Sequence, residues 1–361
     1  MRRVCTVPTG GGGSYPLLCG AGVAGALAAL WQPAWRQAVL VGDSNTVPRF
    51  AAPLQEVLQS CADRVLTLTF AAGEASKTRA TKEELEDALA DGGIDRSGCI
   101  VAVGGGVVLD LAGFVAATYL RGVPHINVAT SLLAQVDAAI GGKTGVNTSR
   151  GKNLVGAFHA PRAVLLDTEA LASLPPAEYL GGVAEVIKHA MIADAELFAA
   201  LERWADSGAA RLPDAVVARA AELKAMVVAA DELEQGRRAV LNFGHTAAHG
   251  IEAATDHAVA HGPAVAAGMV VEIRLAEALG LLSGEVGDRL EALLAKVGLP
   301  TAPQCGFAAA LPFLSRDKKN LAGAIHVALP VRLGSCAAEA GRWTRAVDVA
   351  AFERAWSRPA D

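Results

Sequence analysis

The sequence predicts two domains of different class: a Rossmann-like α/β domain over residues 1–174 and an all-α domain over residues 175–361. Three observations support this prediction. At 361 residues with 52% hydrophobic content, the chain exceeds the usual size of one domain and can bury two cores. Up to about Thr168, short β-branched runs alternate with amphipathic segments. After Pro175, strand patterns become scarce and alanine-rich helical patterns dominate.

The first element to explain is an uncharged, apolar stretch near the N-terminus. Residues 4–35 contain no charged side chain, and part of this stretch looks like the apolar region of a signal peptide. Pro8, the glycines at 10–13 and Pro16 interrupt it, so no continuous apolar span of about 20 residues remains. We therefore expect a hairpin followed by a helix over residues 24–31, rather than a membrane-associated segment.

Five β-branched runs follow, and several end in Gly, Asp, Ser or Thr, where a strand would give way to a loop. Between them lie segments such as TKEELEDALADGG, which combines apolar spacing of helical period with a glycine stop. This alternation indicates a parallel sheet wrapped by helices. The expected strands are residues 38–45, 65–70, 99–106, 125–130 and 163–168.

The second domain is expected to begin at a pair of prolines. Pro175 and Pro176 stop one pattern and start the next. Downstream, residues 214–234 and 264–282 have the composition and periodicity of long helices.

Charge and cysteine content exclude several classes of protein. The net charge is −5, and the 32 basic and 37 acidic residues are dispersed, so no basic stripe could follow a nucleic acid backbone. The six cysteines contain no CxxC pair, which argues against a zinc ribbon and a disulfide framework. We expect a cytoplasmic protein with reduced thiols and no nucleic acid or membrane partner.

A glycine turn is the first candidate binding site. Gly104, Gly105 and Gly106 directly follow an apolar strand, where backbone amides could approach a phosphate at a helix N-terminus. The spacing is not GxGxxG, so a plain tight turn explains it equally well. Polar residues at other strand ends favour a nucleotide, because ligands bind beyond the carboxyl ends of strands in an open α/β sheet. These residues are Asp43, Asn45, Glu74 and Lys77.

The stretch QVDAAIGGKTGVNTSRGKN is the second candidate binding site. Asp137, Lys143, Lys152 and Asn153 stand among glycines, and Arg121 lies upstream. Lysines beside glycines can also be an ordinary solvated loop. Two lysines that follow one carboxylate, in a segment with few large side chains, favour a surface for a phosphorylated substrate.

Metal-ligand residue types cluster in the second domain. Glu185 and Lys188 lie one helical turn apart, which fits either an intrahelical ion pair or a metal-ligating carboxylate beside a substrate-binding ammonium. His245 and His249 share a helix face and could chelate one metal together, and a loop could return His261 to the same point. Spacing alone leaves His249 and His261 as alternatives for the second histidine ligand.

Several long motifs resemble one family in both order and spacing, the 3-dehydroquinate synthases, which are sugar phosphate cyclases. The resemblance covers nearly the whole chain. The motifs are GGGVVLDLAGFVAATYLRG, LLAQVDAAIGGKTGVN, GKNLVGAF, LGGVAEVIKHAMI, GRRAVLNFGHTAAHGIEA, HGPAVAAGM and RDKKNLAG.

The resemblance implies a dehydroquinate synthase-like fold, NAD, one divalent metal ion (zinc or cobalt) and a homodimer. The implied enzyme is a carbon–oxygen lyase of the shikimate pathway that converts 3-deoxy-D-arabino-heptulosonate 7-phosphate to 3-dehydroquinate and phosphate. Transient oxidation by NAD precedes phosphate elimination, and reduction and an intramolecular aldol step then close the ring.

The resemblance also assigns roles to residues. The implied metal ligands are Glu185, His245 and His261. The residues around the reacting hydroxyls are Asp137, Lys188, Glu234 and Asn242. Those at the phosphate end are Lys143, Lys152, Asn153, His249 and Lys319. The carboxylate is held by Lys224 and Arg238, and Arg121 reaches across the dimer interface. The NAD contacts are Asp43, Asn45, Glu74, Lys77, Gly104, Gly105, Gly106, Asp110, Thr130 and Ser131, with Asp137, Lys143 and Lys152 shared.

Departures from the family pattern leave related activities open. Pro263 replaces a carboxylate next to His261, and loss of such a partner can lower metal affinity about tenfold or more. Leu109 replaces a glycine. One alternative is a cyclase of secondary metabolism that forms aminodehydroquinate or acts on sedoheptulose 7-phosphate. The latter substrate has no carboxylate, so Lys224 and Arg238 argue against it. A metal-dependent alcohol dehydrogenase and a non-catalytic binding protein are the remaining alternatives.

Overall fold

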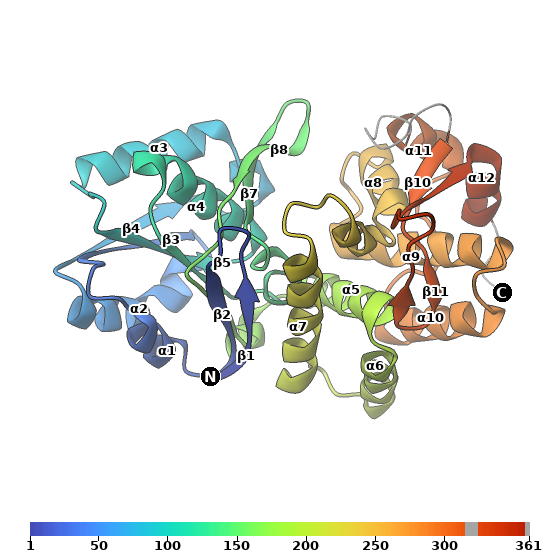
Figure 1. The fold of residues 1–361 in the computed structure, drawn as a ribbon, viewed down its shortest axis with the longest axis horizontal. Helices are drawn as coiled ribbons and strands as arrows, with labels where there is room; N and C mark the ends of the chain where they lie inside the picture. The colour runs from blue at the N-terminus through green and yellow to red at the C-terminus, as the bar shows by residue number, and fades with distance from the viewer. Residues whose placement is uncertain (315–323, 358–361) are drawn as a thin grey trace. The chain divides into compact units, whose positions relative to one another are not determined.

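The computed structural model describes residues 1–314 and 324–357 of the chain. The chain divides into two compact units, Met1–Leu174 and Pro175–Asp361 (Figure 1). Each unit has its own core, and each is described in turn.

A seven-stranded sheet forms the centre of the first unit, in the order β1-β2-β9-β6-β5-β3-β4. The N-terminal hairpin joins β1 and β2 in antiparallel fashion, while the other neighbouring strands are parallel. The strands are β1 (Arg2–Pro8), β2 (Ser14–Gly20), β3 (Gln37–Asp43), β4 (Arg64–Phe70), β5 (Gly98–Gly104), β6 (His125–Ala129) and β9 (Ala163–Asp167). All five β-branched runs are therefore strands, and the expected hairpin extends the sheet.

Helices cover both faces of this sheet (Figure 1). α1 (Val23–Leu30) and α2 (Val47–Cys61) lie on one face, and α3 (Arg79–Asp91) and α4 (Gly106–Thr118) on the other. Every residue of β5 is buried, as expected for a central parallel strand that is covered on both sides.

The glycine-lysine stretch, for which an ordinary solvated loop was the alternative interpretation, forms a turn of π-helix (Ala134–Ala138) and an antiparallel hairpin. The hairpin comprises β7 (Lys143–Thr148) and β8 (Gly151–Phe158). A Cβ atom at Gly156 would lie 1.9 Å from the Thr144 carbonyl oxygen. The glycines thus permit close strand contact, which composition does not distinguish from a flexible loop.

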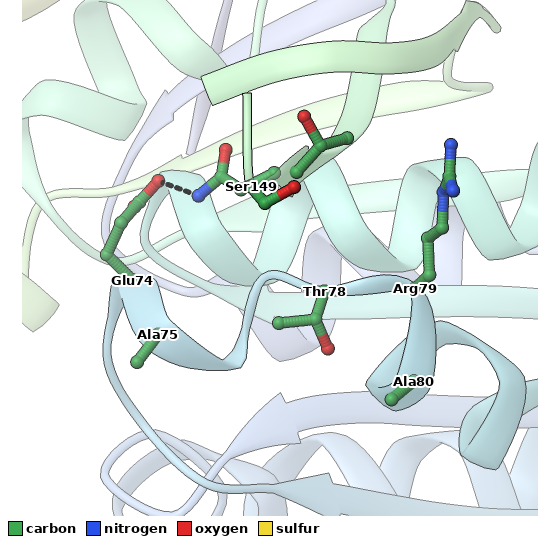
Figure 2. Close-up of a pocket in the computed structure, with 8 residues that line it drawn as sticks. Glu74, Ala75, Thr78, Arg79, Ala80 and Ser149 are labelled. Atoms are coloured by element: carbon green, nitrogen blue, oxygen red, sulfur yellow. Dashed lines mark hydrogen bonds between the residues drawn. The ribbon is translucent and has the colours of Figure 1, made fainter. Parts of the chain in front are cut away.

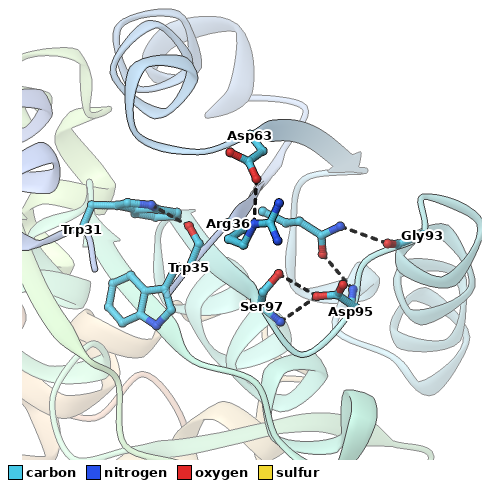
Figure 3. Close-up of polar contacts among 8 residues, drawn as sticks. Trp31, Trp35, Arg36, Asp63, Gly93, Asp95 and Ser97 are labelled. Carbon is cyan, nitrogen blue, oxygen red and sulfur yellow. Dashed lines mark hydrogen bonds and ion pairs between the residues drawn. The ribbon is translucent and has the colours of Figure 1, made fainter. Parts of the chain in front are cut away.

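Polar contacts hold together the edge of the sheet where β3, β4 and β5 begin (Figure 3). The Arg36 guanidinium pairs with Asp63 at 2.8 Å, and the Asp95 carboxylate accepts hydrogen bonds from the backbone and hydroxyl of Ser97. The Trp31 indole donates to the carbonyl of Trp35. These contacts have a structural role at the edge opposite the carboxyl ends of the strands.

The second unit is helical, with two small additional sheets that the sequence did not predict. Its helices are α5 (Pro176–Ala193), α6 (Ala195–Ser207), α7 (Asp214–Ala230), α8 (His245–Ala254), α9 (His261–Ala278), α10 (Gly284–Val297), α11 (Phe307–Leu314) and α12 (Val349–Ser357). The small sheets pair β10 (Ala324–Val327) with β13 (Arg345–Asp348), and β11 (Pro330–Arg332) with β12 (Ser335–Cys336). In the described part of the chain, no helix has the length and apolarity needed to cross a membrane.

Helix α9 is the centre of this unit, and glycines let its neighbours approach its backbone closely. A Cβ atom at Gly262 would lie 2.2 Å from the Cα atom of Gly181 on α5. A Cβ atom at Gly268 would lie 2.0 Å from the carbonyl oxygen of Gly244, the residue that precedes α8. Backbone atoms cannot move aside as flexible side chains can, so these contacts set the spacing of α5, α8 and α9.

Substitution of Gly268 tests this spacing. We expect Gly268→Ala to lower the free energy of unfolding by about 2–3 kcal/mol, because the added methyl group overlaps a fixed carbonyl oxygen. Gly284→Ala is the control, since a Cβ atom at Gly284 meets nothing within 4 Å. Its unfolding free energy should stay unchanged or rise by up to about 1 kcal/mol. Equal losses in the two variants, measured by denaturant titration, would contradict the argument.

Candidate functional site

Three candidate metal ligands from three different helices come together in the second unit. Glu185 lies within α5, His245 is the first residue of α8, and His261 is the first residue of α9. The Glu185 Oε1 atom lies 3.4 Å from His245 Nε2 and 3.3 Å from His261 Nε2. Each residue offers one ligand atom, and these atoms lie within 4.8 Å of one another.

The geometry fits a tetrahedral divalent ion. Two ligand atoms that are each ~2.0–2.1 Å from a tetrahedral zinc ion stand roughly 3.3 Å apart. The two separations from Glu185 match this value. Two imidazoles and one carboxylate would leave the fourth position open, which is the arrangement of catalytic rather than structural zinc sites.

The charges around Glu185 favour its ionised form. This side chain is completely buried, and Lys188 pairs with it one helical turn away. Burial alone would raise the pKa of Glu185, but the Lys188 ammonium and the two imidazoles hold it well below its usual value. Burial and the Lys188 ammonium lower the pKa of His245 to about 3, so this imidazole is neutral and its lone pair is available to a metal.

The structure distinguishes His249 from His261 as the second histidine ligand, a choice that sequence spacing did not make. His249 is exposed, and its ring is perpendicular to that of His245 with the centroids 5.7 Å apart. It is not part of the three-residue group, whereas His261 is. His257 is exposed in the turn after α8, as its surroundings predicted.

A buried carboxylate contacts the candidate ligand His261 from α8. Glu252 Oε2 lies 3.6 Å from His261 Nδ1, on the side of the ring opposite the nitrogen that faces Glu185. Burial lowers the pKa of His261, but the contacts with the Glu185 and Glu252 carboxylates raise it to about 10. His261 thus has a carboxylate partner in Glu252, although the residue at position 263 is a proline.

Four further residues with predicted roles at the substrate also lie in this unit. Lys224 on α7 and Arg238 in the 3-10 turn Arg237–Asn242 are both buried, with exposed fractions of 7% and 2%. The Arg238 guanidinium donates a 2.6 Å hydrogen bond to the Glu232 carbonyl. The Asn242 amide donates to the Glu234 carboxylate at 3.3 Å.

In the first unit, the glycine turn links β5 to the beginning of α4. Gly105 is the N-cap of α4, and none of the described side chains caps this helix. A Cβ atom at Gly105 would lie 3.3 Å from the Ser131 hydroxyl, and the Thr130 amide donates to the Gly104 carbonyl. The turn therefore begins α4 without a side-chain cap, and backbone amides at such a helix N-terminus can bind an anion such as a phosphate.

The end of β3 carries the expected polar turn. The Asp43 carboxylate accepts hydrogen bonds from the backbone amides of Asn45 and Thr46, at 2.9 and 2.8 Å. These bonds fix the turn at the same sheet edge as the glycine turn, because β3 and β5 are adjacent parallel strands.

A hydrogen-bonded group joins residues predicted for NAD with one predicted for phosphate. The buried Lys77 ammonium contacts the Asp110 carboxylate at 2.5 Å and the Asn153 amide oxygen at 2.6 Å. Asn147 donates from its side chain to Glu74 at 2.6 Å, and its amide oxygen accepts from the Asn153 backbone. The β7–β8 hairpin is thereby tied to the segment that precedes α3.

A cavity of about 550 Å³ lies beside this group (Figure 2). The cavity is lined by Glu74, Ala75, Thr78, Arg79 and Ala80 from the segment around the start of α3, and by Asn147, Thr148 and Ser149 from the hairpin. In the close-up, a dashed line marks the hydrogen bond that Glu74 accepts, and Arg79 lies on the opposite side of the view.

Four further residues with predicted roles are exposed or half-buried in the first unit. Lys143 and Lys152 are exposed on the hairpin, and Asp137 is half-buried in the π-helical turn. Arg121 is exposed, and its backbone is left-handed with φ of 66°. Lys319 lies outside the described residues.

Sequence reasoning missed two polar residues at these sites, Asn147 and Glu252. Glu252 had a usable signal, since it follows His245 by seven residues and His249 by three and therefore shares their helix face. Asn147 had none, because its partners Glu74 and Asn153 belong to other elements.

Comparisons with known proteins decide the family. Residues 67–181 match the family described as 3-dehydroquinate synthase N-terminal, and residues 182–320 match 3-dehydroquinate synthase C-terminal. The 3-dehydroquinate synthase of Symbiobacterium thermophilum is 45% identical over 329 residues, which cover 89% of this chain and 92% of the relative. The chain belongs to the 3-dehydroquinate synthase family.

Solved structures of other sugar phosphate cyclases share the dehydroquinate synthase-like fold. A 2-deoxy-scyllo-inosose synthase in complex with carbaglucose-6-phosphate, NAD+ and Co2+ has a TM-score of 0.87 at 25% identity, with 98% of this chain and 99% of that chain covered. The 2-epi-5-epi-valiolone synthase of Streptomyces hygroscopicus with NAD+ and Zn2+ has a TM-score of 0.81 at 28% identity, with 95% and 96% covered.

Removal of single candidate ligands tests the metal centre. We expect Glu185→Gln, His245→Ala and His261→Ala each to abolish stoichiometric zinc binding, because each removes one of the three candidate ligands in this group of described residues. His249→Ala should retain it. Metal analysis after dialysis measures the content, and loss of zinc from His249→Ala with retention in His261→Ala would reverse the assignment.

The contact between Glu252 and His261 makes a second prediction. Glu252→Gln should raise the zinc dissociation constant by about tenfold or more, because the imidazole loses its anionic partner. Pro263→Glu should leave the constant nearly unchanged, since Glu252 already faces the free nitrogen. Chelator competition measures both dissociation constants. Tighter zinc binding by Pro263→Glu would show that Glu252 does not substitute for a carboxylate at position 263.

Proposed function

We propose that the chain converts 3-deoxy-D-arabino-heptulosonate 7-phosphate to 3-dehydroquinate and phosphate, with NAD and one zinc or cobalt ion. The observation that carries the proposal is the Glu185, His245 and His261 group in a chain that belongs to this family. The family activity is that of a 3-dehydroquinate synthase, a carbon–oxygen lyase of the shikimate pathway.

The divalent ion would be held by Glu185, His245 and His261, and NAD by the first unit. When bound, the ion would polarise a substrate oxygen, and NAD would take up and return a hydride. Lys188 keeps Glu185 ionised, which maintains an anionic ligand for the metal. The bound cofactors of the two cyclase structures support this assignment.

For NAD we propose the sheet edge described above. The polar turn after β3 would bind ribose hydroxyls, and the glycine turn would receive the pyrophosphate at the N-terminus of α4. Lys77 would hold Asp110 and Asn153 in place beside the nucleotide, since it contacts both. The residues assigned to NAD are Asp43, Asn45, Glu74, Lys77, Gly104, Gly105, Gly106, Asp110, Thr130 and Ser131.

The substrate carboxylate would be bound by Lys224 and Arg238. Both cations are more than nine-tenths buried, where a charged hydrogen bond to a carboxylate is stronger than in water. A carboxylate-bearing substrate is therefore favoured over sedoheptulose 7-phosphate. Aminated 3-deoxy-D-arabino-heptulosonate 7-phosphate keeps the carboxylate and is the second candidate substrate.

The other substrate groups are assigned as follows. The reacting hydroxyls would be surrounded by Asp137, Lys188, Glu234 and Asn242. The hydrogen bond between Asn242 and Glu234 would orient these two side chains. The phosphate would be bound by the exposed Lys143 and Lys152, together with Asn153, His249 and Lys319. We also propose a cytoplasmic homodimer in which Arg121 reaches the partner. Its left-handed backbone, next to that of Leu120, supports a constrained projecting turn.

Product analysis with two substrates tests the activity. Purified protein with catalytic NAD and zinc or cobalt should release phosphate and form dehydroquinate from 3-deoxy-D-arabino-heptulosonate 7-phosphate, without accumulation of NADH. Sedoheptulose 7-phosphate should remain unchanged.

Lys224→Ala should raise KM for the carboxylate substrate at least about tenfold, as expected for a lost charged hydrogen bond.

Arg237→Ala serves as the control for loss of a cation, because Arg237 is exposed and adjacent to Arg238. Its KM should stay near that of the parent. Release of phosphate from sedoheptulose 7-phosphate, with none from 3-deoxy-D-arabino-heptulosonate 7-phosphate, would assign the chain to the cyclases of secondary metabolism. Turnover of only the aminated substrate would select the second candidate.

A further inference from the structure

The first turn of α8, which begins with the candidate ligand His245, is capped from another helix. Its N-cap residue is Gly244, and no side chain within this segment caps the helix. The Glu272 carboxylate of α9 accepts hydrogen bonds from the Gly244 amide at 2.7 Å and the Ala247 amide at 3.3 Å. The backbone of Thr246 donates to it as well. Amides on both sides of His245 thus converge on one carboxyl group.

Glu272 is an unusual group to bury. It is completely inaccessible, and within the described ranges it forms no ion pair with a lysine or arginine. Burial raises the pKa of Glu272 to about 8, although the amide hydrogen bonds act in the opposite direction. Such burial is costly, so the retention of a carboxyl group at this position requires an explanation.

The surrounding backbone leaves α8 little freedom to adopt another position. Gly244 has φ of 79°, and a Cβ atom there would lie 3.0 Å from both the Met269 amide nitrogen and the Val265 carbonyl oxygen. Gly268 faces Gly244 from α9, and Glu272 follows one helical turn later. Close packing therefore sets the distance between α8 and α9, while the carboxyl group sets the orientation of the first turn.

We propose that Glu272 is a positioning residue for the metal centre, which aligns His245 with His261 by binding the backbone amides that flank His245. The inference rests on the metal site of the proposed function. Because α9 carries both Glu272 and His261, one rigid helix would relate the two imidazoles. Glu272 itself contributes no ligand to the three-residue group.

The test compares two variants that each remove one carboxylate from a contact between α9 and a neighbouring helix. Glu272→Gln replaces one acceptor oxygen with an amide group that faces backbone donors. Glu291→Gln is the matched control, because Glu291 on α10 accepts hydrogen bonds from the buried Arg274 of α9 at 3.0 and 3.2 Å. Both variants should lower the melting temperature.

Only Glu272→Gln should weaken metal binding. Chelator competition is expected to show a zinc dissociation constant raised about tenfold or more, and bound Co2+ should show altered ligand-field bands. Glu291→Gln should match the parent in both. Parent-like zinc affinity and cobalt spectrum in a folded Glu272→Gln would overturn the proposal. Failure of the parent itself to bind zinc would instead overturn the proposed metal site.

Hydrogen exchange of the unaltered protein covers the case in which Glu272→Gln does not fold. If Glu272 couples the first turn of α8 to the metal, added zinc should slow exchange of the Gly244, Thr246 and Ala247 amides several-fold. Amides in the middle of α10 should not respond. Equal exchange at the three amides with and without zinc, in protein shown to bind zinc, would refute the coupling.

Discussion

The arrangement of the second unit depends on how one buried carboxylate is neutralised. Glu185 is completely inaccessible, and an isolated carboxylate in that position would be strongly unfavourable. Lys188 comes from the same helix, whereas His245 and His261 begin α8 and α9. The groups that face Glu185 therefore come from three helices, so the packing of these helices and the candidate metal centre satisfy the same electrostatic requirement.

Small residues set the distances between the three helices that carry these groups. A methyl group at Gly262 would collide with the backbone of Gly181, and one at Gly268 would collide with the backbone of Gly244. Larger residues there would separate the helices whose first residues face Glu185. The alanine and glycine content of this region thus acts on the site through distance, although none of these residues carries a reactive group.

In the first unit, the direction of the strands separates polar residues with different roles. The starts of β3, β4 and β5 carry contacts such as Arg36 with Asp63, which hold neighbouring segments together. The opposite ends carry the glycine turn and the polar turn. Lys77 extends that edge by joining Asp110 on α4 to Asn153 on the hairpin. A parallel sheet makes this possible, because all its carboxyl ends meet at one edge.

The sequence by itself determined the local elements and the types of residue at the sites. The five β-branched runs are strands and the alanine-rich stretches are helices, because hydrophobic periodicity is read within a single segment. It also placed His245 and His249 on one helix face. It did not separate a flexible glycine-rich loop from the β7–β8 hairpin, since the decisive contact between Gly156 and Thr144 joins two strands. Only the tertiary structure decided that His261 faces Glu185 while His249 is exposed, that Glu252 contacts the His261 ring, and that Glu272 binds backbone amides on both sides of His245. The spacing within one helix follows from its pitch, but the distance between helices depends on which side chains their contacts exclude.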